Sequence, residues 1–206
     1  MADTDRVQLL NQAGAVTWDG LKQTLMGLPK ASLVELVNVW MKTFWTNQNY
    51  WMVFTEAEFG FETAARMDEK VWGKTGPIQA YRVKQVLSLG DDVQALATMF
   101  KLTAPQWVPA GFEWSITEIT ESKLSFTVHR CPMGTYRKQN NLELLPCKNI
   151  SPPLYIQMAK VINERFKTTC VHAHPDEPID NVMCQWEFTL EEGQKSEDRK
   201  QMTESK

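Results

Sequence analysis

Residues 112–128 read FEWSITEITESKLSFTV, and within them apolar and polar residues alternate in two runs separated by a polar turn. The apolar positions are Phe112, Trp114 and Ile116, then Leu124, Phe126 and Val128. A period of two residues is typical of half-buried strands. The stretch therefore predicts an antiparallel hairpin that turns around residues 121–123.

The chain before this hairpin follows a helical period instead. Ser32 with Glu35 predicts a capping box, and Gly60 predicts a helix end. Between them lies an apolar stripe made of Leu33, Leu36, Val37, Trp40, Phe44, Trp51 and Phe54. Further helices are expected over 62–72, over 78–87, and from Asp91 or Asp92 to Phe100, with Gly76-Pro77 as a break.

Beyond the hairpin, the pattern predicts a helix over 153–166 and strands over 167–172 and 182–190. The fold class is α+β, with a helical N-terminal half packed on a small antiparallel sheet of about four strands. We expect a single domain over 1–190, with a helical part over about 31–101, a linker over 103–111 and a cysteine-containing, β-rich part over 112–190. The polar tail 191–206 is expected to be disordered. The apolar stripe should cover the sheet face formed by Phe126, Val128, Trp186 and Phe188.

Composition excludes several classes of protein. The 206 residues include 22 Lys and Arg against 25 Asp and Glu, a net charge of −3, which disfavours nucleic acid as a partner. No apolar run approaches the roughly 18 residues of a membrane span, so no membrane partner is expected. The N-terminus carries acidic residues where a signal peptide would be basic, which predicts a cytoplasmic protein with reduced thiols.

Eight tryptophans and ten methionines are many for a chain of this length. Large rings and flexible thioethers can line an adaptable apolar cavity, or they can simply fill the core. The first interpretation makes a small-molecule ligand or substrate the expected partner. A homodimer is a further expectation that the sequence leaves open.

All cysteines and histidines lie in the C-terminal part of the chain, and no C-x-x-C motif is present. Their positions are Cys131, Cys147, Cys170 and Cys184, and His129, His172 and His174. Cys131 follows His129 by two residues, as His172 follows Cys170, so each pair shares one side of an extended strand.

Three interpretations of these residues stay open. In the first, the four cysteines hold zinc or iron, with His172 or His174 as further ligands. In the second, Cys131 is a nucleophile, His129 or His172 is its base, and Arg137 or Arg130 anchors a substrate carboxylate. In the third, the cysteines are structural, since free cysteine is among the most buried residue types.

Several short motifs resemble those of a family of functionally uncharacterised prokaryotic cytosolic proteins that are frequent in anaerobes. These motifs are Trp51 with Glu56-Ala57-Glu58-Phe59-Gly60, Ala64-Ala65, Val71-Trp72, Gly76, Cys131-Pro132, Arg137, Pro146-Cys147-Lys148, Cys170, Pro175-Asp176 and Cys184-Gln185-Trp186-Glu187-Phe188. The likeness covers roughly residues 30–190. More distantly, the layout is similar to that of aminothiazoline-carboxylate hydrolase-like proteins and to a vinyl-reductase-type sensory domain.

The resemblance implies a small α+β protein with a cysteine as the suspected catalytic group or as part of a metal site. The chain departs from the pattern at Ala173, where a further cysteine is expected, and before Trp51, where an acidic residue is expected. These signals predict a cytosolic small-molecule-binding protein with a sensor or accessory role and a Cys/His metal site. The alternative is a cysteine-dependent hydrolase of a small carboxylated substrate, whether cyclic or open-chain.

Overall fold

The computed structural model describes residues 17–103 and 108–192. The predicted tail from residue 193 and residues 104–107 of the predicted linker lie outside the described residues. The helices of the first half are α2 (Trp18–Gly27), α3 (Lys30–Phe59), α4 (Phe61–Leu87) and α5 (Val93–Thr103), followed by the short 3-10 turn η2 (Val108–Ala110). The second half holds β1 (Glu113–Ile119), β2 (Lys123–Arg130), α6 (Pro132–Gln139), α7 (Cys147–Ile150), α8 (Pro152–Ile162), β3 (Phe166–Ala173) and β4 (Cys184–Leu190).

The four strands form one antiparallel sheet in the order β1-β2-β4-β3, which confirms the α+β class. The predicted hairpin is confirmed as β1 and β2, and the backbone N–H of Thr120 donates to Lys123 O at 2.8 Å to close its turn. Strand β4 inserts between β2 and β3, so Phe126 lies opposite Trp186 and Cys170 lies opposite Trp186 on the other side. This register brings the ends of β2 and β4 together, with Val128 beside Cys184.

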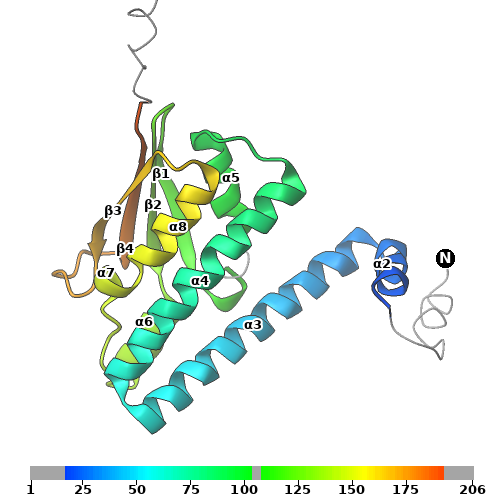
Figure 1. Cartoon of the computed structure of the whole chain (residues 1–206). Coiled ribbons are helices and arrows are strands. Elements are labelled where there is room, and N and C mark those ends of the chain that lie inside the picture. The colour runs from blue at the N-terminus through cyan, green and yellow to red at the C-terminus, as the bar shows by residue number, and fades with distance from the viewer. Residues whose placement is uncertain (1–16, 104–107, 193–206) are drawn as a thin grey trace, which may run out of the picture.

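Helices α5 and α8 cover one face of the sheet (Figure 1). The core between them is aromatic: the ring centroids of Phe100 and Phe188 are 4.9 Å apart, and those of Phe126 and Tyr155 are 5.5 Å apart. Asp92 caps α5 by accepting a hydrogen bond from the backbone N–H of Ala95 at 2.7 Å, as the sequence predicts.

Helix α4 runs unbroken through Gly76-Pro77, so the prediction of two separate helices is wrong. The glycine is buried because α8 crosses it closely: a Cβ on Gly76 would lie 2.2 Å from Leu154 Cδ1. Gly76 therefore permits contact between two helices and does not end one, and packing against α8 outweighs the helix-breaking tendency of Pro77.

Helix α3 begins at Lys30, with Pro29 at its N-cap and no capping hydrogen bond from a side chain, so the predicted capping box does not form. Its end at Gly60 is confirmed, since Gly60 has φ 83° and donates its N–H to Glu56 O at 2.9 Å. Although α3 is long, no helix among the described residues combines the length and apolarity that a membrane span requires.

The predicted packing of α3 is also wrong. The helix lies against α4, and its N-terminal half projects away from the sheet together with α2 (Figure 1). Trp45 and Met52 are its buried residues, whereas most of the predicted stripe, including Trp40, Trp51 and Phe54, is exposed. The sheet face that the stripe was expected to cover is occupied by α5 and α8, whose buried side chains share one core with those of the strands.

Candidate ligand-binding pocket

A pocket of about 170 Å³ lies where α3, α4, α6, α7 and α8 meet the ends of β2 and β4. Most of its lining side chains are apolar. They are Trp45, Trp72, Phe112, Val128, Met133, Leu144, Leu145, Ile150, Leu154, Tyr155, Met183 and Trp186, with Gly134 among them. The remaining lining residues carry polar or sulfur groups: Gln48, Asp68, Cys131, Arg137, Cys147, Ser151, His174 and Cys184.

Aromatic rings form much of the wall. The rings of Trp45 and Trp72 have centroids 5.7 Å apart, and those of Trp45 and Phe112 are 5.1 Å apart. On the sheet side, Tyr155 packs on Trp186 at 4.3 Å. These rings come from α3, α4, α8, β4 and the segment before β1, so the pocket exists only when both halves of the chain are folded together.

Three of the four cysteines line this pocket, namely Cys131, Cys147 and Cys184, while Cys170 is not among the lining residues. Burial raises the pKa of Cys147 to about 12 and raises that of Cys184 further. Burial also raises the pKa of Cys131, against the lowering effect of the backbone N–H groups of Gly134 and Met133 at the start of α6. The thiols are therefore neutral at physiological pH, the opposite of an activated nucleophile.

Asp68 is a polar pocket residue that the sequence analysis missed. Its Oδ1 accepts a hydrogen bond from Gln48 Nε2 at 2.7 Å, and the Trp72 indole also donates to its carboxylate. Burial outweighs these donors and raises the pKa of Asp68 to about 6. Its signal in the sequence was its spacing, because Asp68 lies four residues after Ala64 and four before Trp72, on the inner face of the helix.

Arg137 lines the pocket, but its guanidinium already binds a carboxylate of its own chain. Its two terminal nitrogens donate to the two oxygens of Glu56 at 2.8 Å each, and its Nε donates to Glu143 O. Its Cζ also lies 4.9 Å from the centre of the Phe61 ring. The predicted role of Arg137 as a substrate anchor stays a prediction, and it would require displacement of Glu56.

The hydrogen bonds of His129 go to residues other than Cys131, and the predicted nucleophile and base stay a prediction from the sequence. His129 is exposed, and its two ring nitrogens are hydrogen-bonded to Ser115 Oγ at 2.7 Å and to Asn181 O at 3.0 Å. The reason is strand geometry: β2 ends at Arg130 and the chain turns into α6, so Cys131 faces inward while His129 stays on the open sheet face. Arg130 is likewise exposed, in an ion pair with Glu113.

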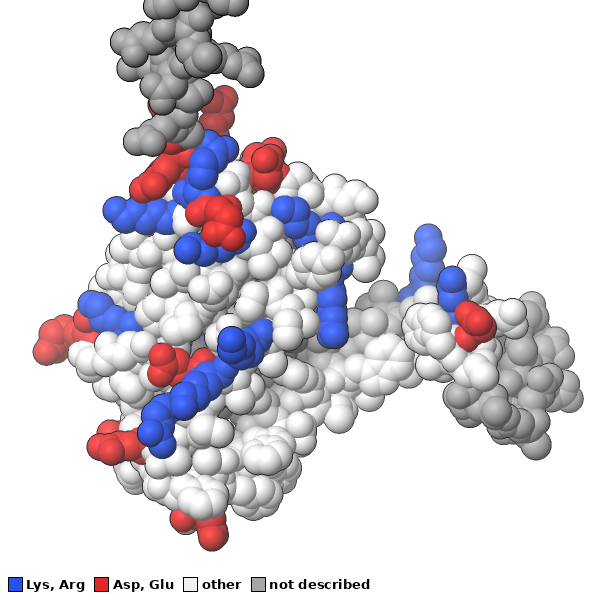
Figure 2. Space-filling model, in the orientation of Figure 1, with Lys and Arg blue, Asp and Glu red and all other residues white. Residues whose placement is uncertain are grey.

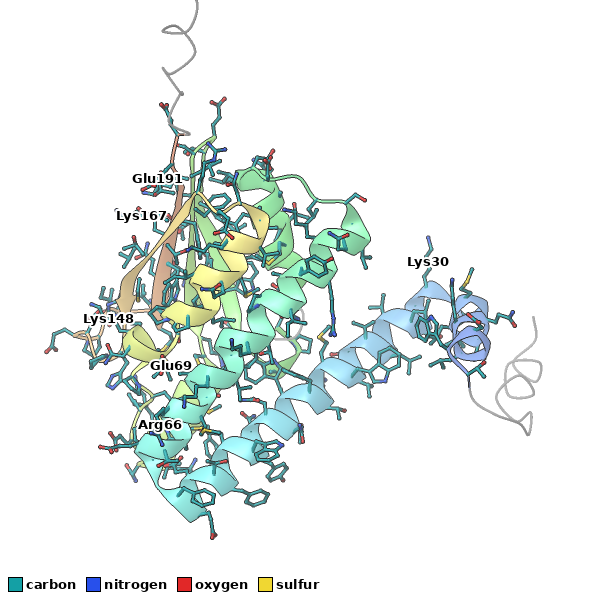
Figure 3. The ribbon with its side chains drawn as sticks, viewed as in Figure 1. Lys30, Arg66, Glu69, Lys148, Lys167 and Glu191 are labelled. Atoms are coloured by element: carbon teal, nitrogen blue, oxygen red, sulfur yellow. The ribbon has the colours of Figure 1, made fainter. Side chains whose placement is uncertain are left out.

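The other histidines divide between the pocket and a neighbouring ion pair. His174 lines the pocket, whereas His172 is buried beside Asp176, with its Nδ1 3.8 Å from Oδ2. Asp176 binds Lys148 Nζ at 2.6 and 2.8 Å, which lowers the pKa of the carboxyl. Figure 3 shows Lys148 at the side of the molecule near β3, where this pair ties α7 to the loop after β3.

The predicted metal site lacks a suitable donor set. Within the described ranges, no group of three or more His, Cys, Asp or Glu side chains is arranged to hold a metal ion. A metal site on Cys131, Cys147, Cys170, Cys184, His172 and His174 stays a prediction from the sequence.

Two indole donors at the pocket, Trp45 Nε1 and Trp186 Nε1, are buried without a hydrogen-bonded nitrogen or oxygen among the described residues, and the Trp186 indole interacts with the Cys184 thiol. The indole nitrogen of Trp45 is buried and forms no hydrogen bond with any described residue, although the side chain is only 8% exposed. A buried N–H group without a partner costs about 1–3 kcal/mol.

The chain is thus an α+β protein with an aromatic, thiol-lined pocket between its helical half and its sheet. Residues 26–190 match the model of a family of unknown function, DUF6125, and the chain belongs to this family. Neither a curated protein nor a solved structure is significantly similar to it. Membership of an uncharacterised family confirms that part of the resemblance, while prokaryotic origin and similarity to hydrolases stay predictions.

Several of the residues that carry the resemblance lie at the pocket, whereas Trp51 and Cys170 are not among its lining residues. Trp72, Cys131, Cys147 and Trp186 line it directly. Others hold its walls: Glu56 binds Arg137, Lys148 binds Asp176, and Gly76 lets α4 approach α8.

Proposed function

We propose that this protein binds a small molecule in the pocket, and that it acts through binding in a sensor or accessory role. The observation that supports this most is that the apolar wall contains two polar groups without a matching partner. The Asp68 carboxylate has no cation among its described partners, and the Trp45 indole N–H has no acceptor. A packed core would pair such groups or exclude them. A ligand site keeps a few of them for orientation.

The size of the pocket limits the ligand. Its volume of about 170 Å³ is close to the roughly 150 Å³ of an engineered protein cavity that accepts benzene. A ligand of one ring with a short substituent fits this space. Larger metabolites such as nucleotides do not.

Charge narrows the ligand further. The charge of Arg137 is neutralised by Glu56, and the thiols and Tyr155 have raised pKa values and are neutral. Asp68 is left as a carboxylate with hydrogen-bond donors but no cation among its described partners. A positively charged nitrogen on the ligand would balance it, supported by the faces of Trp45 and Trp72.

The unpaired indole N–H of Trp45 suggests that the ligand carries a hydrogen-bond acceptor. This N–H group calls for an oxygen or an aromatic nitrogen on the bound molecule. The proposed ligand is therefore a single ring that carries a protonated amine or amidine and one acceptor.

The test is titration of the full chain with three ring compounds of similar size: benzylamine, toluene and benzoate, followed by tryptophan fluorescence and NMR. We expect benzylamine to bind tightest and benzoate weakest. Asp68→Asn should abolish the preference for benzylamine over toluene by removing the charge while it keeps an acceptor for Gln48.

Two further variants make the test specific. Trp45→Phe removes the unpaired N–H and keeps a ring, and it should weaken benzyl alcohol, which has an acceptor, more than toluene. Trp51→Phe is the control, since Trp51 is 68% exposed and is not among the lining residues. Binding of none of these compounds, or equal binding by the wild type and Asp68→Asn, would overturn the proposal.

The hydrolase alternative makes a different prediction for the same thiols. A catalytic cysteine would react with iodoacetamide rapidly at pH 6, where a raised pKa makes the thiol slow. Slow labelling of Cys131, Cys147 and Cys184 at pH 6 is the result expected for a binding protein. Rapid labelling of one of them, blocked by a bound ring compound, would favour catalysis.

A further inference from the structure

We propose that a second copy of this chain packs against the outer face of α3, so that two α3 helices form the centre of a homodimer. The outer stripe consists of Val37, Trp40, Phe44, Trp51 and Phe54, which are between 40% and 68% exposed. The inner face carries Trp45, Gln48 and Met52 toward the pocket and α4, and the stripe borders it at Phe44, whose ring centroid lies 6.0 Å from that of Trp72. The inference is independent of what the pocket binds.

The spacing along the outer stripe is that of a helix–helix seam. From Leu33 to Phe54, the positions are separated by alternating gaps of four and three residues, namely Leu33, Val37, Trp40, Phe44, Asn47, Trp51 and Phe54. This repeat of 3.5 residues keeps one line of side chains toward a partner helix. Asn47 is the only polar member, and a single asparagine in such a seam sets register and the number of helices.

Charge favours a second copy over an oppositely charged partner. Glu35 and Lys42 are the only charged residues between 31 and 55, so α3 offers nothing for charge complementarity over seven turns. In Figure 2 the surface over α3 is mostly white, in contrast to the row of basic side chains on the rest of this face. A self-complementary apolar seam suits an isologous two-fold contact, in which each copy presents the same patch.

The exposed area is enough for a stable dimer. Trp40, Phe44, Trp51 and Phe54, with Trp18 of α2, are between 42% and 68% exposed. At roughly 200 Å² for each aromatic side chain, these five rings leave about 600 Å² in water. A standard interface buries about 800 Å² on each partner, and Val37, Leu21 and Met26 are available for the rest.

Helix α2 supports the same partner independently. It has ten residues, none of them buried, yet it exposes Trp18, Leu21 and Met26. A helix this short is marginal in water without tertiary contacts. Figure 3 shows Lys30 at the end of α3 that lies next to α2 and away from the sheet. This end of α3 and helix α2 are therefore accessible to a second copy.

The experiment is sedimentation velocity of the full chain over a wide range of concentrations. We expect a reversible dimer. The paired variant Trp40→Glu with Phe54→Glu should shift it to a monomer with an unchanged circular dichroism spectrum, because both side chains are exposed within one chain. The matched control is Val39→Glu, since Val39 is 53% exposed, as Trp40 is, but lies off the seam on the same helix.

A second variant tests the seam itself. Asn47→Leu should strengthen association or raise the number of copies, as expected for loss of a polar seam residue. A wild-type chain that stays monomeric at every concentration would overturn the proposal, as would a dimer that Val39→Glu breaks and the seam variant does not. A monomer that co-sediments with phosphatidylglycerol vesicles would assign the outer stripe to a lipid surface instead.

Discussion

Helix α3 has an inner and an outer face of nearly the same composition, and the two have different environments. On the inner face, Trp45 is 8% exposed and belongs to the main core, and Met52 is 4% exposed. On the outer face, Trp51 is 68% exposed and Phe54 is 65% exposed. The contrast shows that aromatic content alone does not make a core: the inner face is core because α4, η2 and the start of the sheet lie against it.

The largest expected effect on stability comes from removing the Trp45 ring from the inner face. Trp45→Ala should lower the free energy of unfolding by about 3–5 kcal/mol, because it leaves a cavity beside the pocket. Val39→Ala on the exposed side of the same helix should change it by less than about 0.5 kcal/mol. Urea unfolding of both variants measures the difference, and a similar loss for each would show that the inner face is not core.

The next effect concerns the ion pair that holds the inner face at its C-terminal end. Arg137→Met leaves Glu56 without its partner, and the loss should be about 3 kcal/mol, since the Arg137 side chain is 3% exposed and Glu56 is 22% exposed. Arg130→Met is the matched control. It breaks an ion pair with Glu113 at 3.3 Å in which both side chains are more than half exposed, so the expected loss is under about 1 kcal/mol. Equal losses would contradict a structural role for the buried pair.

The strands were the most predictable part of the fold. Alternation at Phe112–Ile116 and Leu124–Val128 depends on residues close together in sequence, and β1 and β2 form where it occurs. The capping role of Asp92 is equally local. The packing of α3 relative to the sheet depends on residues far apart in sequence. The apolar stripe exists, but α5 and α8 cover the sheet. The helical period of α3 does not show which helix packs on the strands.

The pocket was predictable only in part. Its thiols were identified, and strand register brings Cys184 next to Val128, close to where Cys131 follows β2. Asp68 and Gln48 were missed because each is one polar residue on an otherwise ordinary helix, and their contact joins positions 20 residues apart. His129 is exposed, on the polar side of its strand, while Cys131, two residues on, lines the pocket, so the shared side of an extended strand did not bring the two together.

Asp68 gives a prediction of intermediate size, which concerns how the free energy of unfolding depends on pH. Burial raises its pKa from 3.8 to about 6, so the folded protein holds the proton more tightly than the unfolded chain. The stabilisation is therefore full below about pH 4 and is lost as pH rises through about 6. At 1.36 kcal/mol for each pKa unit, the wild type should lose at most about 3 kcal/mol over this range relative to Asp68→Asn.

The measurement is urea unfolding of both proteins at several pH values between these limits. Asp180→Asn, which changes an exposed carboxylate, is the control and should follow the wild type. Parallel curves for the wild type and Asp68→Asn would mean that the carboxylate is well solvated. Benzylamine at saturation should flatten the wild-type curve, since a bound cation offsets the cost of the buried charge.

The smallest expected effect is at Gly76, which lets α4 approach α8 and so supports the inner face from behind. A Cβ there would lie 2.2 Å from Leu154 Cδ1 and 3.2 Å from Met158 Cγ. Overpacking costs about 1–3 kcal/mol, while alanine gains up to about 1 kcal/mol in helix propensity over glycine. Gly76→Ala should therefore destabilise the protein by about 1 kcal/mol in urea unfolding. A Cβ at Gly27 in α2 would meet open space, so Gly27→Ala should not lower the free energy of unfolding. A loss of stability in Gly76→Ala but not in Gly27→Ala would show that α4 and α8 are in close contact at Gly76.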